Sequence, residues 1–189
     1  MNTDLHDNHR TEDAVLPVPA ADADIPFFTL PTFREIPNVG LYLEQITKYM
    51  GDYLAPLPDI VLTGSMISNY VKHRILTSPV RKQYNREQIA CLFIIAFAKM
   101  VLTLEDIQQL LAMQRSSYTA EEAYTHFRSL LLSIEADLPD DPVCKLTRQV
   151  TETILCKIRL DAAFRHFPAQ PAEEVSDKAK KAGHDPTKE

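Results

Sequence analysis

Residues 63–76 read "TGSMISNYVKHRIL", and residues 77–85 continue the chain as "TSPVRKQYN". In the first stretch Thr63, a good helix-capping residue, precedes apolar residues at helical spacing, so the pattern predicts an amphipathic helix over 63–75. The second stretch is short and basic and contains a proline, which is typical of a loop or a turn. Two interpretations are open: a surface helix with a solvated loop, or a helix and wing shaped for a DNA groove.

The predicted helix 63–75 separates apolar from polar side chains. Met66, Ile67, Tyr70 and Val71 recur at helical spacing and are expected to face the core. The other face carries side chains that can read DNA: Asn pairs with adenine, Lys reaches guanine or phosphate, and Ser and Thr reach either. Backbone N–H groups at a helix N-terminus also favour phosphate. The DNA-contacting residues predicted on this helix are Thr63, Ser65, Ser68, Asn69, Lys72 and His73.

The segment 77–85 predicts a small two-stranded wing. Arg81 and Lys82 would lie near its tip and contact backbone phosphates beside the groove. Tyr84 would anchor the wing to the domain or touch a sugar. The alternative is a basic, solvated loop.

The charge distribution supports a polyanion-binding surface. The chain carries a net charge of −6, with six acids and one base in residues 1–30 and a neutral body in 31–167. Residues 60–86 contain no acid and five bases, plus His73. A local charge of +5 in an acidic protein can steer a polyanion, although an acid-free stretch can also arise by chance.

The remainder of the body predicts an all-α fold with at most one small β-wing. Capping residues mark the starts of successive helices, beginning with Asn85, Thr103, Thr119 and Asp141. The apolar run "IACLFIIAFA" over 89–98 has 10 residues, too few for a membrane span, and indicates a core helix. The other predicted helices are 39–54, 86–100, one from 103, 119–136 and one from 142 to about 167.

Four regions are predicted from these patterns. Residues 1–30 form a disordered acidic arm, and 31–115 form a winged-helix DNA-binding region. Residues 116–167 form a C-terminal helical pair for packing or dimerisation, and 168–189 form a disordered tail. The three cysteines are expected to be buried, reduced thiols in a cytoplasmic protein.

No enzyme site is predicted. The "HDNH" stretch at 6–9 lacks the further ligands of a metal site. Ser65 and Ser68 have no His or Asp partner visible in the sequence, and the four glycines form no phosphate-binding loop. We expect no catalytic residue, no metal and no cofactor.

Residues 62–111, "LTGSMISNYVKHRILTSPVRKQYNREQIACLFIIAFAKMVLTLEDIQQLL", resemble the winged helix of the MerR (mercury-resistance regulator) superfamily. That pattern has a Thr-started recognition helix, a basic wing closed by a Tyr, and a later "sLeeI" step, here "TLEDI". The resemblance implies a winged helix-turn-helix of MerR type followed by a helical C-terminal cap. The long dimerisation helix and sensor domain of MerR proteins are not evident.

The body, roughly 31–165, more closely resembles a bacterial family, domain of unknown function 1836. The similarity rests on "IPNVGLYLEQITKYM" at 36–50, "LT..MI.NYVK" at 62–72, "P..K.Y.RE.IA.L" at 79–92 and "K.VLTLEDI" at 99–107. The resemblance implies a DNA-binding, regulator-like role.

Three hypotheses follow. The first is a cytoplasmic transcriptional regulator that reads the major groove of double-stranded DNA with helix 63–75 and grips phosphates with wing 77–85. Because one module buries little DNA, two copies are expected, with the last helix as the candidate homodimer contact or simply as core. The second is a protein-interaction module that docks the same basic face on an acidic partner. The third is a small-molecule pocket between helices 86–100 and 119–136.

Overall fold

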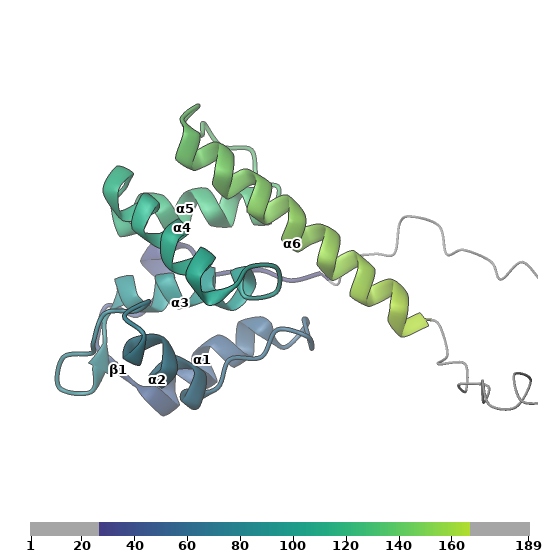
Figure 1. Ribbon diagram of the computed structural model, residues 1–189. Helices are drawn as coiled ribbons and strands as arrows, with labels where there is room; N and C mark the ends of the chain where they lie inside the picture. Colours follow the sequence, from purple (N-terminus) through teal and green to yellow (C-terminus); the bar gives the residue numbers. More distant parts are fainter. Residues whose placement is uncertain (1–26, 167–189) are drawn as a thin grey trace, which may run out of the picture.

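The computed structural model describes residues 27–166 and shows a helical domain with one small antiparallel sheet, as the sequence predicts (Figure 1). The predicted tail at 168–189 and most of the predicted arm lie outside the described residues. The elements are a 3-10 helix Phe33–Glu35, β1 Leu41–Tyr42, α1 Leu43–Leu54, α2 Gly64–Lys72, β2 Gln83–Tyr84, α3 Arg86–Ala98, α4 Leu104–Ser117, α5 Ala120–Leu131 and α6 Pro142–His166.

Helix α3 forms the centre of the domain. It lies between α1 and α2 on one side and α4 and α5 on the other (Figure 1). From Gln88 to Ala98 every side chain except Cys91 is buried. The apolar run 89–98 is therefore a core helix, as predicted. A single hydrophobic core contains residues of α1 and α2 as well as of α4, α5 and α6.

Capping residues begin the helices as the sequence predicts. The Asn85 side chain accepts from the Gln88 N–H at 2.9 Å, and Thr103 and Thr119 accept in the same way at the starts of α4 and α5. Asp141 accepts the N–H groups of residues 143 and 144 at the start of α6. Each bond satisfies a donor that a helix N-terminus leaves unpaired.

The predicted helix 39–54 is wrong at its start. Residues Leu41 and Tyr42 form β1, which pairs antiparallel with β2, so that Leu41 lies opposite Tyr84. The helix begins only at Leu43, where the Gln45 side chain caps the Tyr42 N–H at 2.9 Å. A partner about forty residues away determines this conformation, and local periodicity cannot reveal it.

Residues 28–30, predicted as part of the disordered arm, pack on the domain. The Phe28 ring stacks on Phe97 with centroids 5.8 Å apart, and Leu30 is buried. Arg128 and Tyr124 of α5 donate to the carbonyls of Leu30 and Pro31 at 2.9 and 2.8 Å. Residues 28–30 therefore belong to the folded domain, while residues 1–26 of the predicted arm lie outside the described residues.

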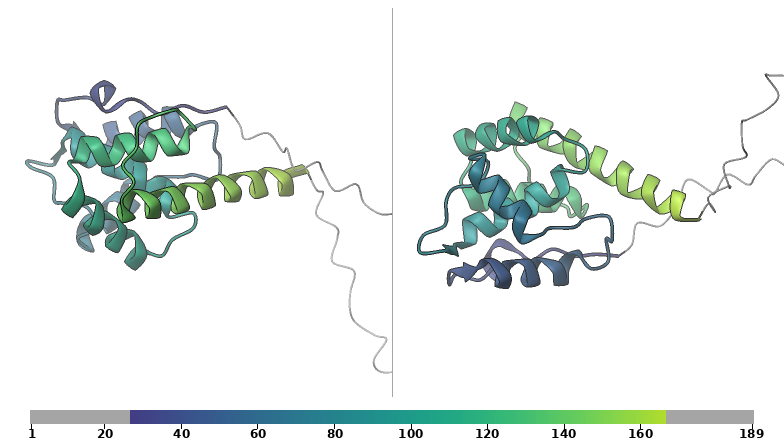
Figure 2. Two further views of the ribbon diagram at one scale, coloured as in Figure 1. Left: turned by 90° about the horizontal axis from the view of Figure 1, so that it is seen from above. Right: turned by 60° about the horizontal axis from the view of Figure 1, so that its bottom comes forward.

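Helix α6 packs against α3, α4 and α5 and extends past the rest of the domain (Figure 2). Its inward stripe of Val150, Ile154 and Ile158 belongs to the core. Beyond that stripe Leu160 and Phe164 are exposed. The helix is therefore core over its first part and has unpaired apolar side chains, within the described residues, near its end.

The cysteine prediction is partly wrong. Cys144 is buried, but Cys91 is half-buried and Cys156 is exposed, and all three are free thiols. Cys156 lies on the outer face of α6, which the helical pattern around it did not distinguish from the inner face. Within residues 27–166, no helix combines the length and the apolar character that a membrane span requires.

Two glycines give opposite predictions for an added methyl group. In Gly40→Ala the new Cβ would lie 2.8 Å from the Gln83 Cβ and force β1 and β2 apart, so we expect a loss of about 1–3 kcal/mol of unfolding free energy. Gly51 lies inside α1 with nothing within 4 Å of such a Cβ, so Gly51→Ala should gain about 0.5–1 kcal/mol. Urea unfolding of both variants checks the pair; a stabilised Gly40→Ala would contradict the close approach at β2.

Candidate nucleic-acid interface

Helix α2 presents its predicted contact face to solvent. Thr63 caps it, and its hydroxyl accepts from the Met66 N–H at 3.2 Å. Ile67 and Tyr70 are buried on the opposite side, so the helix is fixed by its apolar face. All six residues predicted to contact DNA from this helix are exposed: Thr63, Ser65, Ser68, Asn69, Lys72 and His73.

The helix ends earlier than the predicted residue 75. Arg74 has a left-handed backbone with φ of 58°, and the Ile75 N–H donates to the Tyr70 carbonyl at 2.9 Å. This is the hydrogen-bond pattern of a Schellman motif, usually formed with glycine at the left-handed position. The chain then turns into the core, where Ile75 and Leu76 are buried. Of the predicted DNA-reading helix 63–75, only residues 64–72 are therefore helical.

A two-residue hairpin forms the wing that follows. Val80 and Gln83 exchange backbone hydrogen bonds of 3.1 and 2.9 Å, with Arg81 and Lys82 at the tip. Both tip residues have positive φ, 52° and 64°, which is the signature of a type I′ turn. Asn and Gly favour this turn, whereas a left-handed residue with a long side chain costs about 1–2 kcal/mol. The wing thus holds two cations in a strained tip.

Tyr84 does not belong to the exposed face. Its side chain is 5% exposed and belongs to the core cluster, and burial raises the pKa of its hydroxyl. Its backbone pairs with Leu41 of β1. Of the two roles considered for Tyr84, the structure therefore places it as the anchor of the wing and away from the surface that a sugar would reach.

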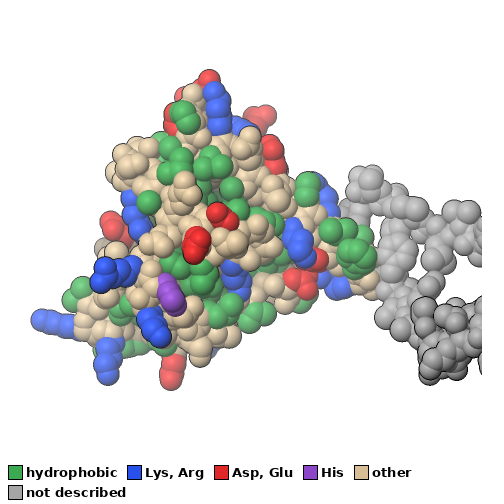
Figure 3. Space-filling view, viewed as in Figure 1, with side chains coloured by type: hydrophobic (Ala, Val, Ile, Leu, Met, Phe, Trp, Pro, Cys, Tyr) green, Lys and Arg blue, Asp and Glu red, His purple; other side chains and the backbone are tan. Residues whose placement is uncertain are grey.

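Four of the five bases of the acid-free stretch 60–86 lie on the surface. Lys72, Arg74, Arg81 and Lys82 are exposed, and within the described residues none of them lies within 4.0 Å of an acidic oxygen. Glu44 of α1 lines the same shallow hollow as Lys82 but lies beyond that distance. Lys and Arg side chains accordingly gather over α2 and the wing in the space-filling view (Figure 3).

The fifth base, Arg86, has a structural role. Its Nε donates to the Ile36 carbonyl at 2.7 Å and its Nη2 to the Arg34 carbonyl at 3.2 Å. Its guanidinium also lies over the Phe33 ring, 5.6 Å from the centroid. These contacts tie the N-terminal segment to α3, so Arg86 adds little to the basic surface.

Lys99 is a further cation beside α2, and it is not among the residues predicted from the sequence to contact DNA. Its Nζ donates to the Val61 carbonyl and lies 3.8 Å from the Met66 sulfur. With Ser65, Asn69 and Thr103 it lines a shallow groove along α2, and burial lowers its pKa. In the sequence Lys99 only closes an apolar helix, and no local pattern connects it with residues thirty positions earlier.

The positions of possible metal ligands can be compared with the sequence prediction. Among residues 27–166, no group of three or more His, Cys, Asp or Glu side chains is placed to hold a metal ion. The "HDNH" stretch lies outside the described residues.

Residues 31–127 match a family described as a domain of unknown function (DUF1836), which covers just over half of the chain. The chain belongs to the DUF1836 family. The match contains α2, the wing and α3 entirely, while α6 lies beyond it. Neither the curated proteins nor the solved structures contain a significant match to this chain.

Proposed function

We propose that this DUF1836 protein binds double-stranded DNA and acts in the bacterial cytoplasm as a transcriptional regulator, with a winged helix-turn-helix of MerR type. One observation carries the proposal: the two-cation tip of the wing keeps a strained backbone beside an exposed polar helix. Strained conformations persist where the surrounding structure imposes them, and they cluster at functional sites. Two adjacent left-handed cations at an exposed tip therefore support a binding role for the wing.

The α2 face supplies the chemistry for reading the major groove. Asn69 can pair bidentately with adenine, and Lys72 and His73 can reach guanine or phosphate. The Ser68 hydroxyl donates to the Gly64 carbonyl at 2.9 Å, which leaves its oxygen as an acceptor. Donor groups at the start of α2 and the guanidinium of Arg81 would contact the phosphates that position the helix.

Specific binding by this domain would need two copies. A single module buries little DNA, and paired half-sites raise specificity. Among the exposed apolar side chains of the described residues, Leu160 and Phe164 lie on α6, the helix expected to contact a second copy. A homodimer is therefore part of the proposal.

Titration of the full chain with labelled duplex DNA at several salt concentrations tests the proposal. Affinity should fall steeply with salt, because bound phosphates release counterions in proportion to the number of contacts. Absence of binding to any duplex at low salt would refute it. Salt-sensitive capture of an acidic protein, with no duplex binding, would instead favour the interaction-module hypothesis, which uses the same cations.

Asn69→Ala provides a test of base reading. On a duplex selected from a random library, this variant should lose about 1–3 kcal/mol of binding free energy and its preference at one adenine. Its affinity for unselected duplex should stay unchanged. Arg148→Ala is the matched control, since Arg148 is exposed on α6, away from α2 (Figure 1). Equal losses on selected and unselected duplexes would show that Asn69 contacts phosphate. No loss on either duplex would show that Asn69 does not contact DNA.

A further inference from the structure

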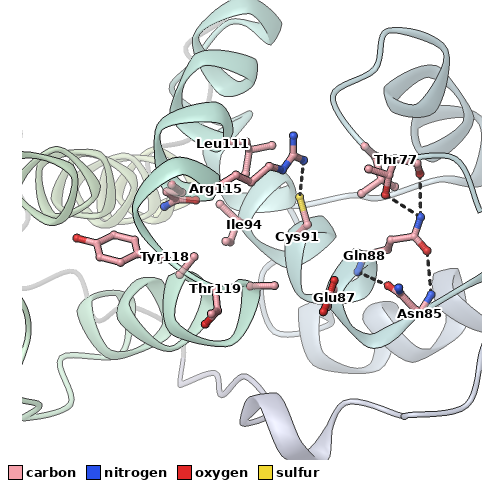
Figure 4. A pocket seen from close by; sticks show the side chains of 14 residues that line it. Thr77, Asn85, Glu87, Gln88, Cys91, Ile94, Leu111, Arg115, Tyr118 and Thr119 are labelled. Carbon is pink, nitrogen blue, oxygen red and sulfur yellow. Dashed lines mark hydrogen bonds between the residues drawn. The ribbon is translucent and has the colours of Figure 1, made fainter.

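A cavity of about 320 Å³ lies where α3, α4 and the start of α5 meet the segment that follows α2 (Figure 4). Its size is at the lower end of the range for ligand pockets, roughly 300–1,000 Å³. Apolar side chains form much of its wall: Leu76, Ile94, Leu111, Ala120 and Ala123. The cavity is therefore a place where a small, partly apolar molecule fits.

Gln114 on the cavity wall has a buried oxygen without a partner. Its side chain is 2% exposed, and its Nε2 donates to the Thr147 Oγ1 at 3.2 Å. The Thr147 hydroxyl gives its only hydrogen to the Val143 carbonyl at 2.9 Å, so Thr147 must accept from Gln114. The amide orientation is thereby fixed, and the Gln114 Oε1 has no hydrogen-bond donor in the structure. This oxygen has almost no accessible surface, so the hydroxyl or amine of a ligand would supply a donor once the Gln114 side chain shifts towards the cavity.

Arg115, the next residue of α4, brings a positive charge to the same cavity. Its Nη2 donates to the Ile75 carbonyl at 2.9 Å and lies 3.9 Å from the Cys91 sulfur. Within residues 27–166 no acidic oxygen lies within 4.0 Å of this guanidinium. Its other N–H groups can therefore receive a carboxylate, the partner that a guanidinium binds in a bidentate manner. Glu87 also lines the cavity and would disfavour a ligand with more than one negative charge.

The cavity wall is bonded directly to the segment between α2 and the wing. Arg115 holds the Ile75 carbonyl, and Gln88 of α3 donates to the Thr77 carbonyl at 2.8 Å and to its hydroxyl at 3.0 Å. These residues fix the direction in which the chain leaves α2. A carboxylate bound to the remaining N–H groups of Arg115 holds the same guanidinium that donates to the Ile75 carbonyl, so it acts on that segment by repositioning the Arg115 side chain. A ligand then makes different contacts in two arrangements of α2 and the wing, which coupling requires.

We propose that this cavity binds a small monocarboxylic acid with an apolar body and a hydroxyl or amine group. The carboxylate pairs with Arg115, and the donor group pairs with the Gln114 Oε1. Occupancy changes the affinity for DNA through Ile75 and Thr77, and this coupling rests on the proposed DNA-binding function.

Protein-observed NMR of the full chain with a panel of such acids tests the site without DNA. The panel is 4-hydroxybenzoate, 2-hydroxybutyrate, leucine and phenylalanine; benzoate lacks the donor and phenol lacks the carboxylate. We expect at least one acid to shift the signals of the cavity wall. Gln114→Leu, which keeps the volume and removes the oxygen, and Arg115→Gln should each weaken that binding about tenfold or more. Arg148→Gln should leave it unchanged.

Two results would overturn the proposal. The first is a panel without shifts at the cavity wall, which would mean that water pairs with Gln114. The second is binding that neither Gln114→Leu nor Arg115→Gln weakens. The bound acid should also change duplex affinity in the parent protein and not in Arg115→Gln; an unchanged affinity would refute the coupling alone. Because the NMR result needs no DNA, failure of the proposed DNA binding cannot be mistaken for failure of the site.

Discussion

The Phe93→Ala variant is expected to lose about 3–5 kcal/mol of unfolding free energy, which approaches the whole stability of many domains of this size. Phe93 is fully buried in the middle of α3. Its ring meets three tyrosine rings, of Tyr49, Tyr53 and Tyr124, with centroids 6.0–6.3 Å apart. Truncation removes the free energy of burying the ring and its contacts with the three tyrosines. It also leaves a cavity that the surrounding helices cannot close completely.

Urea unfolding followed by circular dichroism measures this loss. Phe27→Ala is the matched control, because Phe27 is 92% exposed and its removal should change stability by no more than about 0.5 kcal/mol. A loss below about 1 kcal/mol in Phe93→Ala would contradict the central position of α3. A large loss in both variants would show that Phe27 is buried in solution.

The starts of α3, α4 and α5 were predictable because their signals are local. Asn85, Thr103 and Thr119 each cap a helix with a side chain that reaches a backbone N–H three residues later. The apolar run 89–98 was equally informative, since ten consecutive apolar residues in a domain of this size require burial on all sides. Short-range chemistry thus determines where these three helices begin and which one forms the core.

The ends of two helices were not predictable, because the usual stop residue is missing. Both α2 and α5 end in a Schellman motif whose left-handed position holds Arg74, with φ of 58°, or Ser133, with φ of 52°. Glycine normally marks this position, and the chain has only four glycines. The predicted ends at 75 and 136 were therefore too late. Beyond the α2 turn the buried Ile75 and Leu76 hold the chain in the left-handed conformation, whereas Ile134 after the α5 turn is exposed.

Helical periodicity predicted which α2 side chains lie on the candidate surface, but the sequence did not show where that surface ends. Helical periodicity separated the exposed Asn69 and Lys72 from the buried Ile67 and Tyr70. Tyr84 was expected at the surface or as an anchor, and only the pairing of β2 with β1 shows that it is an anchor. The cavity beside Arg115 depends on how three helices meet, which no local sequence pattern specifies.

Replacing the wing tip by Arg81→Asn with Lys82→Gly is expected to stabilise the fold and weaken DNA binding at the same time. Asn-Gly is the preferred pair of a type I′ turn, so removal of the two strained residues should gain about 1 kcal/mol of unfolding free energy. Loss of two phosphate contacts should lower duplex affinity about 60-fold at 0.1 M salt, since each contact contributes roughly a factor of 8 there. The salt slope should shrink by about two.

The opposite signs of these two changes make the test decisive, because a variant that is more stable cannot lose DNA affinity by unfolding. Exchanging the cations, Arg81→Lys with Lys82→Arg, keeps both charges and both left-handed residues, so neither the stability nor the salt slope should change appreciably. If Asn-Gly stabilises the protein and leaves the salt slope unchanged, the wing does not contact phosphates. The strain at Arg81 and Lys82 would then serve another partner of the same face, for which an acidic protein is the candidate.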